Sequence, residues 1–396
     1  MTPAVRALSP TDVERGFRLL ERSFGHVAHD EDVPVELAMV DAKRFYGAYD
    51  TDELVGTAGS FAFSMAVPGA VTDVAGVTWV GVSPTARRQG VLRSFMTRQL
   101  ADLHADATAV AALWASEGAI YPRYGYGVAA WHHGITLPRG ARFHRPVEPG
   151  GLRLVEPSAA ALTPVHDALA ARTPGWFARD EAWWAHRLHD PQHARDGATG
   201  LQCVVTDGGY ALYAQQGVWR DGVASGTVTV RELAAVDEPA RERLWRYLLD
   251  LDLMAEVVCR LVPTDDPLLQ LLAEPRLARA RTSESLYVRL VDVPRALEAR
   301  RYACDLDVVL EVRDEHCPWN ARRVRLTGGR DGATCAPTDG APDLAMDVRD
   351  LGAAFLGGTT LVSRRATVQE RTPGALARAS TAFGPVDTAP WCPMVF

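Results

Sequence analysis

The feature that most constrains this chain is a buried strand followed by a basic turn and a helix with one apolar face. Residues 77–82, VTWVGV, form the apolar and β-branched run that is typical of a buried strand, and Ser83-Pro84 ends it. Beyond the turn, apolar side chains recur every three to four residues, which predicts a helix. The apolar face of this helix consists of Val91, Leu92, Phe95, Met96, Leu100 and Leu103.

The turn between strand and helix has the chemistry of an anion-binding site. A helix start exposes unpaired backbone N–H groups and the positive end of the helix dipole, and both suit a phosphate. Gly90 leaves room for a close approach, while Arg87 and Arg88 supply forked cationic donors. Because arginine in a first turn is unfavourable for the dipole, the pair indicates a bound anion. The alternative is a surface helix whose first turn is basic without a function.

The turn resembles a known cofactor loop. Residues 87–92, RRQGVL, are similar to the acetyl-CoA pyrophosphate loop of GNAT N-acetyltransferases, R/Q-x-x-G-x-G/A, with Leu92 in place of the second small residue. With the preceding V-x-V strand, the run looks like the Eis (enhanced intracellular survival) acetyltransferases of actinobacteria. The resemblance implies acetyl-CoA as co-substrate, with its pantetheine paired to the backbone like an extra strand. The cofactor-binding residues that it implies are Val80, Gly81, Val82, Arg87, Arg88, Gln89, Gly90, Val91, Leu92 and Ser116.

A second segment resembles the same family. Residues 115–127, ASEGAIYPRYGYG, follow a predicted strand and match A-S-E-x-x-I-Y-x-R-F/Y-G-Y-G. In the family, the tyrosine between the two glycines is the general acid, and here it is Tyr126. A phenol with a pKa of about 10 stays protonated at pH 7 and can hand a proton to a departing thiolate. Spacing alone does not separate Tyr126 from Tyr121 or Tyr124, and the alternative is a buried tyrosine with a satisfied hydroxyl.

The C-terminal tail, residues 383–396, is apolar and rich in proline, whereas most termini are polar and frayed. We expect it to dock against the protein. In the family that it resembles, the carboxylate of a terminal phenylalanine is the general base, and Phe396 matches that pattern. A free carboxylate with a pKa of about 3.5 is a weak base, so burial would raise that pKa, or water would relay the proton. The alternative is a terminus that is buried for packing only.

The resemblance also indicates an amine pocket. We expect Phe24, Trp79 and Trp114 to line it, together with His26, which stands where the family often has an acidic residue. Because of His26 and Val395, this pocket is less obviously acidic than the family pattern. The family acetylates aminoglycosides, often at several amines, and also protein lysines. Four further histidines show no metal-ligand spacing and are interpreted as solvated or pocket residues: His29, His186, His189 and His193.

The chain of 396 residues is long enough for two or three domains. A linker rich in proline and glycine predicts a boundary near residue 150. Residues 151–286 repeat the order strand, turn, helix and strand, but the turn VDEPAR at 236–241 is acidic and lacks glycine. We therefore predict a degenerate GNAT-like domain without a CoA site, with an unrelated α/β domain as the alternative. Residues 287–396 resemble a sterol-carrier-protein-2-like (SCP2-like) domain.

The predicted fold class is α/β (α+β), with two tandem GNAT-like domains and an SCP2-like α+β domain. Residues 1–150 form the acetyl-CoA-binding catalytic domain, residues 151–286 the degenerate domain, and residues 287–396 the domain whose C-terminus enters the active site. This organisation predicts an acetyl-CoA-dependent N-acetyltransferase that acts on primary amines of aminoglycoside-like or other polyamine substrates. Transfer is expected to be direct, in a ternary complex. The alternatives are a protein lysine acetyltransferase and a non-catalytic CoA- or lipid-binding module.

Charge and composition narrow the partners. A net charge of −7 argues against general nucleic-acid binding. No apolar run reaches the roughly 18 residues of a membrane helix, and the N-terminus lacks a signal-peptide core, so we expect a cytoplasmic protein with no membrane partner. The six cysteines are scattered without a C-x-x-C motif, which indicates reduced thiols and no metal site. The expected partners are acetyl-CoA and a small amine, and the resemblance implies a homo-hexamer.

Overall fold

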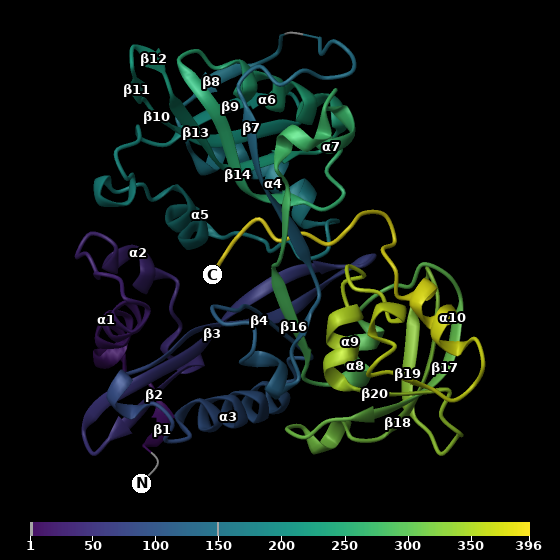
Figure 1. Cartoon of the computed structure of the whole chain (residues 1–396). Helices are drawn as coiled ribbons and strands as arrows, with labels where there is room; N and C mark the ends of the chain where they lie inside the picture. The colour runs from purple at the N-terminus through teal and green to yellow at the C-terminus, as the bar shows by residue number, and fades with distance from the viewer. Residues whose placement is uncertain (1–2, 149) are drawn as a thin grey trace.

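The computed structural model describes residues 3–148 and 150–396. Figure 1 shows three domains, with the second above, the first at the lower left and the third at the lower right. The C-terminal tail leaves the third domain, passes the second and ends near the first. No described helix has both the length and the apolar character needed to cross a membrane.

The first domain is a seven-stranded sheet with helices on both faces. Alternating residues of β4 fall into two separate cores, one with α1 and one with α3, so these helices cover opposite faces. The predicted strand at 77–82 and the helix from residue 91 are confirmed as the end of β4 and as α3. In spatial order, the strands are β1 (Ala4–Ala7), β2 (Phe45–Asp50), β3 (Glu53–Val67), β4 (Ala70–Val82), β5 (Val110–Trp114), β16 (Leu286–Leu290) and β6 (Gly127–Val128). The helices are α1 (Val13–Phe24), α2 (Val33–Ala38) and α3 (Val91–Ala105).

The second domain repeats this plan. Its seven-stranded sheet contains, in spatial order, β15 (Arg281–Glu284), β7 (Trp131–Pro138), β14 (Met254–Pro263), β13 (Gly226–Ala235), β10 (Gly209–Gln216), β9 (Gln202–Thr206) and β8 (Arg153–Val155). A small ribbon projects from it, formed by β11 (Trp219–Arg220) and β12 (Val223–Ala224). The helices are α4 (Ala159–Ala170), α5 (Glu181–Leu188), α6 (Glu238–Asp250) and α7 (Leu268–Leu271).

The third domain has a five-stranded mixed sheet. Strand β17 pairs antiparallel with β18 and runs parallel to β20. The strand order is β19 (Ala333–Pro337), β18 (Arg323–Gly328), β17 (Leu306–Arg313), β20 (Leu344–Asp347) and β21 (Gln369–Glu370). The helices are α8 (Val293–Glu298), α9 (Val348–Ala354) and α10 (Ala375–Ala382).

The first two sheets exchange strands across the boundaries expected near residues 150 and 286. Strand β7 precedes the linker but belongs to the second sheet, and β16 follows the second domain but pairs with β5 in the first sheet. All five residues of β16 are buried, among them Arg289, whose guanidinium pairs with the Asp314 carboxylate at 2.8 Å. The position of the linker in the sequence therefore does not mark where one sheet ends and the next begins. Strand pairing is decided by contacts between segments that are distant in the sequence.

The two parallel strands at the centre of the first sheet diverge. Strands β4 and β5 pair only where Val74–Gly76 lie opposite Val110–Ala112, although β4 continues to Val82. The register of β3 and β4 shifts at a bulge where Trp79 has a φ of 53°, and the Thr57 hydroxyl donates to the Trp79 carbonyl at 2.8 Å. Beyond Gly76, the backbone edge of β4 that faces β5 is therefore open.

Candidate active site

The open edge of β4 leads to the start of α3. Helix α3 begins after Gly90, which has a φ of 85°, and no described side chain caps it. The Arg87, Arg88 and Gln89 side chains are exposed beside this end. The structure thus brings the predicted cofactor residues of β4 and of the turn together around an unblocked helix start, which fits a diphosphate.

A cavity of about 380 Å³ lies where α1, α2, β4, β5, α5 and the C-terminal tail meet. Seven predicted site residues line it: Phe24, His26, Trp79, Val80, Trp114, Ser116 and Phe396. Its other lining residues are Phe17, Leu20, Glu21, Glu36, Met39, Phe61, Val77, Thr78, Ala115, Tyr121, Trp183, His186 and Val395. The predicted amine-pocket residues therefore share one cavity with the end of the chain.

The last residue lies at the point where β4 and β5 part. The Phe396 ring packs edge-on against Phe63 and Phe177, with ring centroids 5.1 and 5.2 Å apart. A β-carbon on Gly76, the last paired residue of β4, would lie 3.1 Å from the Phe396 ring. The tail is buried from Trp391 to Met394, as expected for a docked terminus.

Two carboxylates in the cavity were missed by the sequence analysis. Glu21 and Glu36 both line it, and the Glu36 carboxylate pairs with the His186 imidazole at 3.1 Å. Desolvation raises the pKa of Glu21, while the His26 imidazole opposes this shift. A signal was available, because Glu21 follows Phe17 by four residues and precedes Phe24 by three, which places all three on one face of α1. With His26 at the position expected to be acidic, these two carboxylates supply the negative charge.

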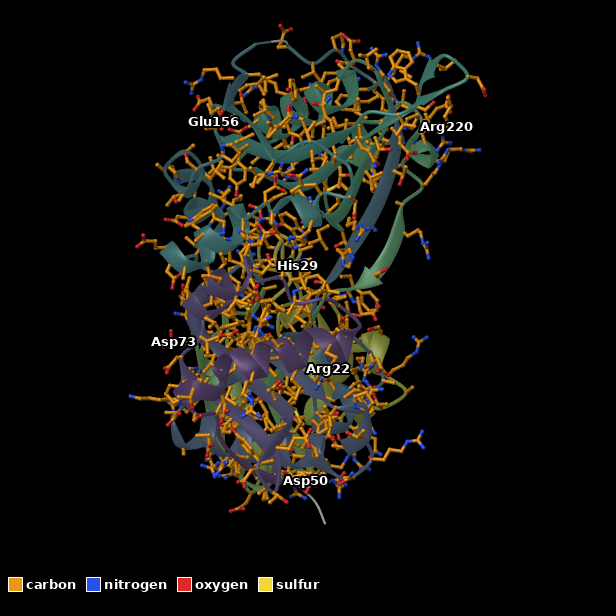
Figure 2. The ribbon with its side chains drawn as sticks, turned by 90° about the vertical axis from the view of Figure 1, so that its left-hand side faces the viewer. Arg22, His29, Asp50, Asp73, Glu156 and Arg220 are labelled. Atoms are coloured by element: carbon orange, nitrogen blue, oxygen red, sulfur yellow. The ribbon has the colours of Figure 1, made fainter. Side chains whose placement is uncertain are left out.

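Histidines and carboxylates join the loop after α1 to the second domain. The His193 imidazole lies 2.6 Å from the Glu31 carboxylate and 3.1 Å from the Asp32 carboxylate, while His189 lies 2.8 Å from Asp32. His29 stacks on His193 with centroids 3.7 Å apart, and Figure 2 shows His29 where the upper and lower parts of the molecule meet. A second cavity of about 380 Å³ beside the first is lined by three members of this group, Asp32, His189 and His193. Within the described ranges, no cluster of histidine, cysteine or carboxylate residues has a metal-binding arrangement.

Tyr126 lies behind the cavity wall rather than on it. Its ring is fully buried in the core on the α3 face of the first sheet, and its hydroxyl has no hydrogen-bond partner among the described residues. The Tyr121 ring, which does line the cavity, lies 5.9 Å away. Burial raises the pKa of Tyr126, partly opposed by the Arg289 guanidinium. Such an unpartnered buried hydroxyl fits a group that is satisfied only when a ligand is bound.

Each of the three domains matches a known protein family. Residues 4–129 and 175–290 match two acetyltransferase (GNAT) domain families, and residues 293–393 match the sterol carrier protein domain family. The N-acetyltransferase Eis of Mycobacterium bovis is 36% identical over 87% of both chains. The chain belongs to the Eis-like GNAT N-acetyltransferases. An uncharacterized N-acetyltransferase of Streptomyces avermitilis is 43% identical over the full length of both chains. The Eis-like fold is also seen in the crystal structure of Eis1 from Mycobacterium abscessus, which has a TM-score of 0.87 and 33% identity over 99% of this chain and 100% of that chain.

The second domain of this Eis-like enzyme presents a different helix start. Its parallel strands β13 and β14 pair only as far as Val230 and Cys259, so they also diverge. The Asp237 carboxylate, however, accepts a hydrogen bond from the Ala240 backbone N–H at 2.8 Å and caps α6. An anion at this position would meet a carboxylate instead of open N–H groups. The GNAT fold implies acetyl-CoA, and the first domain has the helix start that suits it.

Proposed function

We propose that this Eis-like enzyme transfers the acetyl group of acetyl-CoA directly to a primary amine of a small polycationic substrate, aminoglycoside-like or another polyamine. The observation that carries this proposal is the cavity at the β4–β5 opening, which combines Glu21, Glu36 and the last residue of the chain. Carboxylates attract ammonium groups, and the aromatic side chains around them offer flat surfaces to the rest of the substrate.

The open edge of β4 and the start of α3 hold acetyl-CoA in this proposal. The Val80 and Val82 backbone groups pair with the pantetheine, and the turn from Arg87 to Leu92 binds the pyrophosphate. When bound, acetyl-CoA supplies the acetyl group as a thioester. Its position between the strands links the two faces of the sheet, with Phe396 on one face and Tyr126 on the other.

Two groups of this chain move protons in the proposal. The Phe396 carboxylate takes a proton from the acceptor amine, and the Tyr126 hydroxyl gives one to the departing sulfur. A raised pKa keeps the Tyr126 phenol neutral and therefore able to donate. Tyr121 is the second candidate for the acid, because it is the tyrosine that lines the cavity.

The test is the release of CoA from acetyl-CoA with a panel of amines that contains an aminoglycoside, a linear polyamine and a lysine peptide. We expect turnover with the first two, and at least a hundredfold lower kcat in Tyr126→Phe and after removal of Phe396. Tyr124→Phe, which loses a hydroxyl from the same turn outside the cavity, is the matched control. A loss in Tyr121→Phe instead would move the acid role to Tyr121.

Two other results would contradict the proposal. Exclusive turnover of the lysine peptide would favour a protein acetyltransferase. Binding of acetyl-CoA without turnover of any amine would favour a non-catalytic module.

A further inference from the structure

The C-terminal tail is held at few places before it reaches the active-site cavity. Between Gly384 and Phe396, the Asp265 carboxylate of the second domain hydrogen-bonds to the tail at two neighbouring residues. One oxygen, Oδ2 of Asp265, accepts both the Thr388 hydroxyl and the Ala389 backbone N–H, each at 2.8 Å. Two donors on one carboxylate oxygen hold the tail where it enters the protein.

The second anchor lies two residues further along. The Trp391 backbone N–H donates to the Pro174 carbonyl oxygen at 2.9 Å, and the Trp391 ring packs against the Trp176 ring with centroids 5.3 Å apart. A single anchor would let the tail pivot, whereas two consecutive anchors fix its direction as well as its position. From Ala389, seven residues span at most roughly 24 Å to Phe396, and Pro390 and Pro393 restrict their path.

Asp265 stands where the second domain's own cofactor position would be. It follows β14 directly, beside the first turn of α6, at the end where β13 and β14 have separated. The cavity of about 390 Å³ at this place is lined by the tail and by Arg241, whose guanidinium is already paired with Asp266 at 2.6 Å. The position that binds acetyl-CoA in the first domain therefore faces a segment of the chain itself in the second.

We infer that Asp265 is a positioning residue for acetyl transfer, and that the degenerate second domain serves as the anchor that sets the place of the C-terminal carboxylate. This inference rests on the proposed role of Phe396. Asp265 touches neither substrate nor cofactor and acts through the tail. When its two hydrogen bonds are lost, the carboxylate spends less time in the reactive position, and displacements of about 1 Å can lower rates by up to about a hundredfold.

The test uses the full-length protein. We expect Asp265→Ala to lower kcat about tenfold to a hundredfold with an unchanged KM for acetyl-CoA. Asp265→Asn keeps an oxygen that accepts both hydrogen bonds, so it should restore most of the rate. Asp387→Ala removes an exposed neighbouring carboxylate that forms no hydrogen bond with any described residue, and it should behave as wild type.

A second measurement reads the tail directly. Carboxypeptidase should release Phe396 faster from Asp265→Ala than from the wild type, from Asp265→Asn or from Asp387→Ala, as followed by intact mass. A wild-type kcat and release rate in Asp265→Ala would overturn the inference, and so would equal losses in Asp265→Ala and Asp265→Asn. If removal of Phe396 leaves kcat unchanged, the proposed base is wrong. If that removal abolishes turnover while Asp265→Ala does not, only the anchor is wrong.

Discussion

At the scale of single residues, the grouping of the turn residues and the docking of the tail were predictable from the sequence, while the carboxylates of the cavity were missed. Gly90 and the two arginines beside it form a local motif, so their grouping needed no knowledge of the fold. Glu21 shares one face of α1 with Phe17 and Phe24, but the sequence does not show what packs against that face. It lines the cavity because the tail and α5 approach α1 from far along the sequence.

The aromatic residues show the same limit. Trp183 lines the cavity, whereas Trp176 and Trp184 pack with Trp391 in a core of the second domain. The sequence does not separate these two outcomes, because tryptophan occurs both in protein cores and in binding sites.

Glu21→Gln tests the charge of the cavity. Loss of one carboxylate should raise the KM for a cationic amine about two- to fivefold, since a partly exposed ion pair contributes up to about 1 kcal/mol. The KM for acetyl-CoA should not change, and the difference between variant and wild type should shrink at high salt. Steady-state kinetics with both substrates varied would measure this.

Glu14→Gln is the control for this prediction, because Glu14 lies on the exposed side of the same helix and pairs with Arg18. If both glutamate variants raise the amine KM equally, the effect belongs to the overall charge of the protein.

At the scale of elements, local periodicity predicted strands and helices well and their partners poorly. The strand at 77–82 and the helix from residue 91 were found from their patterns. Residues 287–290 were assigned to the third domain, whereas the strand Leu286–Leu290 completes the first sheet. The sequence of a buried apolar strand does not show which sheet edge the strand will join, because different apolar neighbours pack against it equally well.

The contact between the loop after α1 and the second domain should depend on pH. The hydrogen bond to Glu31 raises the pKa of His193 in the folded state, and the Asp32 charge adds to the shift. A raised pKa means that the contact stabilises the fold fully below the unfolded value of about 6.5 and is lost as the pH rises through the folded value. We expect the Tm difference between wild type and His193→Gln to be larger at pH 6 than at pH 9.

His144→Gln, which replaces an exposed histidine elsewhere, serves as the control and should show no such trend. A Tm difference for His193→Gln that is equal at both pH values would show that the contact does not depend on the proton.

At the scale of the whole molecule, the third domain is joined closely to the first. Helix α9 packs on β16 and β6 so tightly that a β-carbon on Gly352 would clash with the Val288 carbonyl oxygen, and one on Gly127 would clash with the backbone of α9. Since α10 and the tail follow α9 in the same domain, this contact sets where the tail begins.

Gly352→Ala should disturb this junction. Overpacking in a tight contact costs about 1–3 kcal/mol, so we expect the Tm to fall by several degrees and kcat to fall with it. Gly340→Ala, in an exposed loop of the same domain, is the matched control, because its β-carbon would meet only ordinary contacts. Thermal unfolding and amine turnover would be measured on both variants, and equal Tm values would show that the junction can adjust.

The exchanged strand has a consequence for how the molecule is made. During synthesis, the first sheet lacks β16 until residue 290 has left the ribosome, although its other strands are complete by residue 128. A fragment that stops at the linker would expose the unsatisfied edge of β5 to any passing polypeptide.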